Sequence, residues 1–261
     1  MGTMPFNEGD YILIDYIVKV KEDDRVIDTT IEEEAKKAGV YEEGKVYGPE
    51  LVIIGEGWIL KSAEEEIKKM NVGEEKTFEI PPEKAFGQRD PSKIRVVSIR
   101  DLQRRNIRPK INEIINFDGK PAIVKRIGSG RVILDFNHPL AGKTLVYTVK
   151  VVKKIEKTED KIKELIRRRI HLIDLNKVNV TIEDHTATVL LPLDLLSYSN
   201  INLALRGIIR DIDRYIKEIS AVKIIFEATF ERETAEKPKK EEEKPEKPES
   251  KSASEKAATT E

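Results

Sequence analysis

The sequence predicts an α+β protein with several folded units, and three observations lead to this prediction. The chain has 261 residues, more than the roughly 100 to 200 of one compact domain. Up to about residue 155, apolar segments with the two-residue period of strands alternate with short helical patterns. Beyond that residue, two stripes of apolar residues recur at helical spacing.

The first part of the chain is expected to begin with an antiparallel pair of strands. Residues 11–20 are apolar and rich in strand-forming residues, and the acidic turn 22–24 separates them from Val26-Ile27. A helical pattern at 31–39 ends at a glycine, and a second helix is expected at about 61–70. A strand at 76–80 follows and stops before two prolines.

Residues 88–136 are expected to form a small, strand-rich unit. Asp118-Gly119 and Gly128-Ser129-Gly130 are typical of tight turns between strands. The apolar residues of this unit form either its core or an exposed surface, and both interpretations stay open because about 50 residues need most of their apolar side chains to hold together. They include Ile94, Val96, Val97, Ile99 and Phe117.

Residues 145–152 form a further alternating strand, with an apolar pattern like that of residues 11–20. Residues 156–232 then follow the order helix, two strands, helix, strand, which predicts a separate C-terminal α+β domain. The stripe from Ile201 to Ile219 is interpreted as a buried helix face, with homodimerisation as the second interpretation. Residues 233–261 are charged, without large apolar residues, and are expected to be a disordered tail.

The composition restricts the chemistry. With 47 Lys and Arg against 48 Asp and Glu, the net charge of −1 argues against nucleic acid as a partner. RNA binding through Arg167-Arg168-Arg169 or Arg206, Arg210 and Arg214 is the weaker interpretation of these residues, because acidic residues accompany the second set. The absence of Cys excludes disulfides and thiolate sites, and a cytoplasmic location without membrane contact is expected. Charged residues at 36% are typical of a thermophile.

Catalytic motifs are mostly missing. No glycine-rich phosphate loop follows a strand, no His-x-x-x-His pair is present, and the chain has 3 His. We therefore expect neither a metal nor another cofactor. What remains is a set of apolar and aromatic positions around one acid, Asp28, in the string Val-Ile-Asp-Thr-Thr.

Four strings in order carry a resemblance to a known family. They are VIDTT (26–30), GEGWILKSAEEEI (55–67), PPEKAFG (81–87) and NHPLAGKTLVYTV (137–149). Together they resemble the FKBP-type peptidyl-prolyl cis/trans isomerases, and the last string is similar to the SlyD-type branch. This resemblance implies an antiparallel sheet wrapped on a short helix, formed by residues 1–87 and 137–155, with residues 88–136 as the insert-in-flap domain. The C-terminal domain resembles the extra domain of long archaeal FKBP-type proteins.

The resemblance also implies the residues of a prolyl pocket. Its catalytic residues would be Tyr16, Asp28, Phe86 and Tyr147, and its substrate-binding residues Ile27, Ile59, Leu60, Ala63 and Leu140. Asp28 would either interact with the substrate carbonyl or orient Tyr16. The sequence departs from the family pattern at Phe86, where Tyr is common, and at Ala63, where a large residue is common. It also departs at Ser62, in place of Gly, and at Glu50, in place of an apolar residue.

Two functions remain open at this point, beside a third, a ribosome- or RNA-associated factor working through the C-terminal domain, which the near-neutral charge argues against. The first is a prolyl isomerase that acts on unfolded or proline-containing polypeptides, with chaperone activity in the insert. The second is a non-catalytic holdase chaperone that keeps the fold while its pocket has lost activity.

Overall fold

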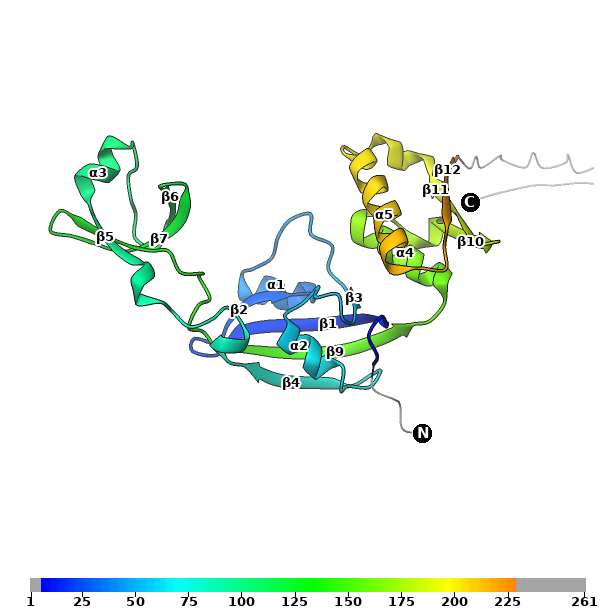
Figure 1. Ribbon diagram of the computed structural model, residues 1–261, viewed down its shortest axis with the longest axis horizontal. Coiled ribbons are helices and arrows are strands. Elements are labelled where there is room, and N and C mark those ends of the chain that lie inside the picture. Colours follow the sequence, from blue (N-terminus) through cyan, green and yellow to red (C-terminus); the bar gives the residue numbers. More distant parts are fainter. Residues whose placement is uncertain (1–5, 229–261) are drawn as a thin grey trace, which may run out of the picture. The chain divides into compact units, whose positions relative to one another are not determined.

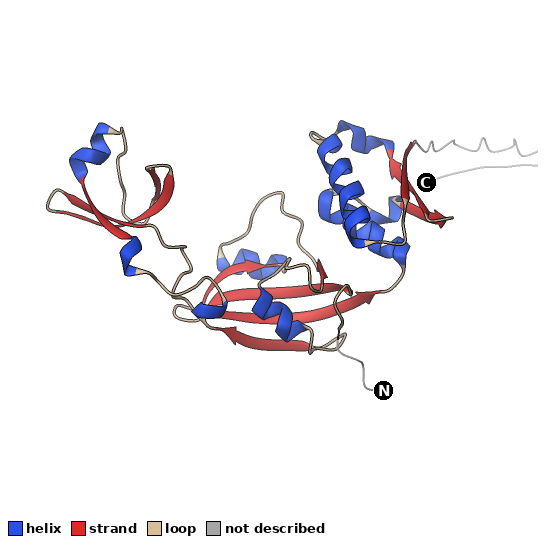
Figure 2. Ribbon diagram, in the orientation of Figure 1, coloured by secondary structure: helices blue, strands red, loops and turns tan. Residues whose placement is uncertain are grey.

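The computed structural model describes residues 6–228, and Figures 1 and 2 show their helices and strands. The expected tail at 233–261 lies outside the described residues. The strands are β1 (Tyr11–Val20), β2 (Arg25–Thr29), β3 (Glu50–Ile53), β4 (Glu75–Ile80), β5 (Ile94–Ser98), β6 (Ile114–Phe117), β7 (Lys120–Gly128), β8 (Arg131–Asp135), β9 (Leu145–Ile155), β10 (Asn179–Glu183), β11 (Thr186–Pro192) and β12 (Ala221–Glu227). The helices are α1 (Glu32–Ala38), α2 (Lys61–Ile67), α3 (Ile99–Arg104), α4 (Thr158–Arg169) and α5 (Ile201–Tyr215).

The first domain is an antiparallel sheet in the order β2-β1-β9-β4, with β3 also paired to β1. Strands β2 and β3 pair with different halves of β1, and β9 pairs with it along the other side. Helix α2 packs Ile67 into a core with Ile12, Ile14 and Val151 of the sheet. The antiparallel sheet and the short helix are therefore present as predicted (Figure 2).

The glycine predicted to end the first helical segment does so in the structure. Gly39 follows α1 with φ of 68°, a left-handed conformation that a residue with a Cβ adopts at a cost. Its N–H donates to the Lys36 carbonyl at 3.2 Å and so satisfies one of the last carbonyls of the helix.

The insert has its own four-stranded sheet, in the order β5-β8-β7-β6. Asp118 and Gly119 have φ of 55° and 75° in the turn between β6 and β7, as expected for this dipeptide. The unit is strand-rich as predicted, and residues 99–104 form helix α3, which the sequence did not predict. Ser98 caps this helix by accepting a hydrogen bond from the Arg100 N–H, and Leu102 is fully buried.

The apolar residues of the insert divide between core and surface. Phe117 is buried, and Val97 and Ile99 pack against the same core. Val96 is 60% exposed, and so are Ile111 and Ile114, at 58% and 62%. Both interpretations of the sequence therefore hold, each for different residues.

The C-terminal domain has the predicted order of helix, two strands, helix and strand. Its sheet runs β10-β11-β12, antiparallel between the first two strands and parallel between the last two. Helices α4 and α5 bury their apolar faces in one core with Val180, Val189 and Leu191 of the sheet. That core continues into Tyr11, Leu51 and Ile53 of the first domain.

An ion pair between a buried aspartate and an exposed arginine joins the two helices of the C-terminal domain. Asp211 of α5 is 4% exposed and accepts two hydrogen bonds from the Arg169 guanidinium of α4, at 2.6 and 2.7 Å. Gly207 permits this approach, because a Cβ there would lie 3.1 Å from Arg169 Nε.

We expect Asp211→Ala to lower the free energy of unfolding by about 2 kcal/mol, since it removes two charge-assisted hydrogen bonds and leaves Arg169 without its partner. Chemical denaturation followed by circular dichroism measures this. The control is Asp213→Ala, an exposed position on the same helix. Equal stability of the two variants would contradict the role given to Asp211.

Candidate active site

A cavity of about 620 Å³ opens on the first domain, between the sheet and the loops beside it. Its wall is mostly apolar, with polar groups from four strands and two loops. The lining residues are Ile14, Tyr16, Val18, Ile27, Asp28, Glu42, Glu50, Trp58, Ile59, Ile67, Phe86, His138, Leu140, Leu145, Tyr147 and Val149.

Strands β1 and β9, in the middle of the sheet, form the floor of the cavity with every second side chain. Ile14, Tyr16 and Val18 occupy alternate positions of β1 and therefore share one face of the sheet. On β9, Tyr147 lies opposite Val18, and Val149 lies opposite Tyr16. The sequence before the insert and the sequence after it thus meet in one floor.

Tyr16 and Asp28 form the polar centre of the cavity. The Tyr16 hydroxyl lies 3.0 Å from Asp28 Oδ2 and 3.3 Å from Glu50 Oε2, so its single proton has two carboxylate acceptors. Asp28 Oδ1 accepts from Lys45 Nζ at 3.0 Å and from the Thr29 N–H at 2.9 Å. Of the two roles open to Asp28, this geometry supports the one in which it orients Tyr16.

Burial and the nearby carboxylates keep both tyrosine hydroxyls protonated. The pKa of Tyr16 is raised well above its usual range by burial, and further by the charges of Glu50 and Asp28. Burial, with a smaller contribution from Asp28, raises the pKa of Tyr147 to about 12. The Tyr147 hydroxyl has no hydrogen-bond partner among residues 6–228, so it is available to donate to a substrate carbonyl.

Lys45 keeps its charge beside Asp28. Partial burial lowers its pKa, but the hydrogen bond and the charge of Asp28 outweigh burial, so the net change is upward. This pair lies partly exposed, with Lys45 outside the lining of the cavity.

Phe86 and His138 form an aromatic edge of the cavity. Their rings stack with centroids 4.2 Å apart and planes 6° apart. His138 Nδ1 accepts from the Leu140 N–H at 3.2 Å, a local hydrogen bond within the loop before β9. In the part of the chain that the structure describes, no group of His, Cys, Asp and Glu could hold a metal ion.

Seven of the nine residues expected in the pocket line this cavity: Tyr16, Ile27, Asp28, Ile59, Phe86, Leu140 and Tyr147. The other two do not. Ala63 is fully buried under the cavity in a cluster with Val20 and Ile80, and Leu60 packs against that cluster. Their contribution is therefore to the packing below the site.

The sequence did not identify Glu42, Glu50, Trp58 and His138 as lining residues. Trp58 directly precedes Ile59, which was expected in the pocket, and the chain has 1 Trp. Its position beside a pocket residue was therefore the signal that could have identified it. Its indole N–H donates to the Tyr215 hydroxyl at 3.3 Å, and the two rings meet edge to face at 5.4 Å. Arg168 lies over its ring at 3.9 Å.

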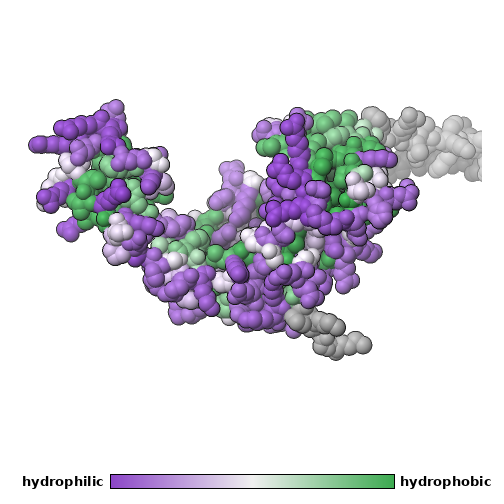
Figure 3. All heavy atoms as spheres, viewed as in Figure 1, coloured by the Kyte–Doolittle hydropathy of each residue, from purple (hydrophilic) through white to green (hydrophobic). Residues whose placement is uncertain are grey.

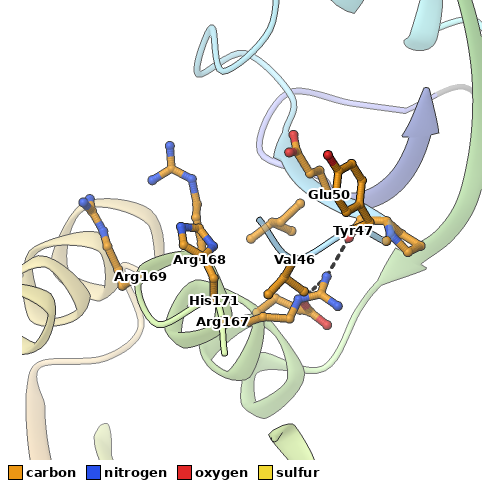
Figure 4. A pocket seen from close by; sticks show the side chains of 11 residues that line it. Val46, Tyr47, Glu50, Arg167, Arg168, Arg169 and His171 are labelled. Carbon is orange, nitrogen blue, oxygen red and sulfur yellow. Dashed lines mark hydrogen bonds and ion pairs between the residues drawn. The ribbon is translucent and has the colours of Figure 1, made fainter. Parts of the chain in front are cut away.

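Helix α4 also contacts the loop that leads into β3. The Arg167 guanidinium donates to the Pro49 carbonyl at 2.8 Å, on one side of a groove of about 440 Å³ (Figure 4). Figure 4 shows Arg167, Arg168, Arg169 and His171 on the helix side of this groove and Val46, Tyr47 and Glu50 on the loop side. Glu50 lines both the groove and the cavity.

Comparison with known proteins identifies the family of the chain. Residues 95–140 match the family model described as "FKBP26, IF domain", and residues 158–229 match the model described as "FKBP26_C-terminal". The short-type peptidyl-prolyl cis-trans isomerase of Methanocaldococcus jannaschii is 42% identical over 144 residues, which cover 55% of this chain and 90% of that protein.

Bacterial relatives show the same family. A probable FKBP-type 16 kDa peptidyl-prolyl cis-trans isomerase of Pseudomonas fluorescens is 32% identical over 38% of this chain and 68% of that protein. SlyD of Helicobacter pylori, also an FKBP-type isomerase, is 27% identical over 58% of this chain and 75% of that protein.

The chain therefore belongs to the FKBP-type peptidyl-prolyl cis-trans isomerases. Within that family it is of the long type, with an insert and an additional C-terminal domain. The reaction has a barrier of roughly 18 to 20 kcal/mol, because twisting the peptide bond removes its resonance. The twisted bond is less polar than the planar one, so an apolar cavity favours it over the ground state, and no covalent step is needed.

We expect Asp28→Ala to lower kcat/KM at least about ten-fold, because the variant removes a charged acceptor that orients Tyr16. If Asp28 acts through Tyr16, Tyr16→Phe causes a similar loss and the double variant adds little. Exchange spectroscopy by NMR on a short Xaa-Pro peptide measures the rates, and Asp23→Ala on the neighbouring turn is the control. Full additivity of the two losses would show that Asp28 acts independently of Tyr16.

Proposed function

We propose that this isomerase acts on Xaa-Pro bonds of unfolded or partly folded polypeptides, which its insert captures as a chaperone. The observation that carries the proposal is the pair of exposed apolar side chains on the two edge strands of the insert. Val96 of β5 and Ile114 of β6 are 60% and 62% exposed. Figure 3 shows hydrophobic residues on the visible face of the insert, among hydrophilic ones.

Edge strands suit an extended, unfolded partner. β5 and β6 each pair on one side only, with β8 and β7 respectively, so their other backbone groups can bind a further strand. An exposed apolar side chain on such a strand adds burial to those hydrogen bonds. Both features recognise the extended backbone of an unfolded chain and require little of its sequence.

Capture by the insert raises the local concentration of Xaa-Pro bonds at the cavity. A polypeptide held by one site meets the second site at an effective concentration near the millimolar range, when the connecting chain can reach it. The insert should therefore matter for protein substrates and contribute little for peptides too short to reach both sites. In a holdase, by contrast, peptide exchange would stay at the rate in buffer.

The double variant Val96→Ser/Ile114→Ser loses two apolar contacts with the captured polypeptide. It should therefore lower kcat/KM at least about ten-fold for a protein whose refolding is limited by prolyl isomerisation. The rate on a short Xaa-Pro peptide should stay unchanged. The control is Val72→Ser, at a valine of the first domain that is 45% exposed. Equal losses on protein and peptide would contradict capture by the insert.

We also propose a homodimer through the C-terminal domain. Leu203 of α5 is 72% exposed, and Ile209 of α5 and Ile225 of β12 are each 45% exposed, so this domain leaves three large apolar side chains uncovered. The location of the protein is a separate question. No helix of residues 6–228 is long and apolar enough to cross a membrane. The cytoplasmic location stays a prediction of the sequence.

Leu203→Glu should shift the protein from dimer to monomer, because it places a charge in the apolar contact. Light scattering after size exclusion gives the mass of each form. Asn202→Glu, at the exposed neighbouring position, is the control for added charge. A monomeric unmodified protein at micromolar concentration would refute the dimer.

A further inference from the structure

The prolyl cavity carries a negative charge that its chemistry does not require. Asp28, Glu42 and Glu50 line it, while no Lys or Arg is among its lining residues. Twisting a peptide bond needs an apolar wall and a hydrogen-bond donor, and Tyr147 and the apolar floor already supply these. The additional carboxylates therefore call for a separate explanation.

Among the described residues, one of the three carboxylates, that of Asp28, forms an ion pair with a cation. Lys45 pairs with Asp28 at 3.0 Å. Within residues 6–228, no Lys or Arg forms an ion pair with Glu42 or Glu50. The described contact of the Glu50 carboxylate is with the Tyr16 hydroxyl, a neutral donor.

The arginines of the neighbouring groove do not compensate Glu50, because each has another partner. Arg167 pairs with Glu164 at 2.7 Å and bonds the Pro49 carbonyl. Arg168 stacks on Trp58, and Arg169 binds Asp211 with two hydrogen bonds. Figure 4 shows them on the opposite side of the groove from Glu50.

We propose that Glu50 is a specificity-determining residue, which favours substrates with a Lys or Arg next to the proline. The carboxylate stands 3.3 Å from the Tyr16 hydroxyl at the polar centre, so it lies where the residues beside a bound proline pass. Consecutive Cα atoms are about 3.8 Å apart, and a Lys or Arg side chain of an adjacent residue therefore reaches Glu50. The negative field also acts on the site itself: burial is the main cause of the raised pKa of Tyr16, and the charges of Glu50 and Asp28 raise it further.

The expected size of this preference is modest. Glu50 is exposed, and exposed ion pairs contribute little because water and salt screen them. We therefore expect peptides with a basic residue to be isomerised about two- to five-fold faster, in kcat/KM, than neutral ones at low ionic strength. The preference should shrink in about 0.5 M salt, where the screening length is only a few ångströms.

The test compares short proline peptides that carry Lys, norleucine or Glu directly before or directly after the proline. Norleucine has the length of Lys without its charge, so the ratio of the Lys rate to the norleucine rate isolates the electrostatic effect. NMR exchange gives kcat/KM for the unmodified protein, for Glu50→Gln and for Glu65→Gln. Glu65 is an exposed residue of α2 outside the cavity, and its substitution makes the same change in net charge.

The proposal predicts that the ratio is above one in the unmodified protein and in Glu65→Gln, at one or both peptide positions, and falls towards one in Glu50→Gln. A ratio of one or less in the unmodified protein, or an equal ratio in Glu50→Gln, overturns it. Short peptides do not depend on the insert. Failure of polypeptide capture would therefore leave these ratios unchanged, and the two proposals are tested separately.

Discussion

The pairing of β1 with β9 is the constraint on which the rest of the structure depends. The two strands pair from Tyr11 with Ile155 to Val20 with Leu145. One end of this ladder supplies Tyr16 and Tyr147 to the cavity, and the other end places Tyr11 and Ile155 in the core of the C-terminal domain. A slip of β9 by one residue against β1 would turn Tyr147 and Val149 to the other face of the sheet, away from the cavity.

The insert separates β1 from β9 in the sequence, so the two strands can pair only if the two ends of the insert lie close together. Hydrogen bonds at the insertion point hold them there. The Phe136 N–H donates to the Lys93 carbonyl at 3.0 Å, and the Gly142 N–H donates to the Gly87 carbonyl at 2.8 Å. The folded insert therefore leaves and returns at neighbouring points. Since the entropy of closing a loop depends on the flexible chain between its ends, a folded insert adds far less than its number of residues suggests.

Sequence reasoning identified most of the fold because the strands and the longer helices carry periodic apolar patterns. It missed helix α3, which has six residues and a single fully buried side chain, Leu102, too few for a helical period to be visible. It identified seven lining residues through ordered motifs. It missed Glu42 and Trp58 because loops bring them to the cavity, and neither residue belongs to a periodic pattern.

Trp58 shows how the C-terminal domain contributes to the cavity without supplying a lining residue. Its ring is held by Arg168 at 3.9 Å and by the edge of Tyr215, both from helices of that domain. A cation over an aromatic ring and an edge-to-face pair are each worth about 0.5 to 1.5 kcal/mol. Together they favour one orientation of the indole by roughly five-fold or more, since 1.4 kcal/mol corresponds to a factor of ten. At Ala63, where the family commonly has a large residue, this chain has a small, fully buried one. One aromatic wall of the cavity therefore depends on contacts made by a separate domain, and its rigidity is coupled to the docking of that domain.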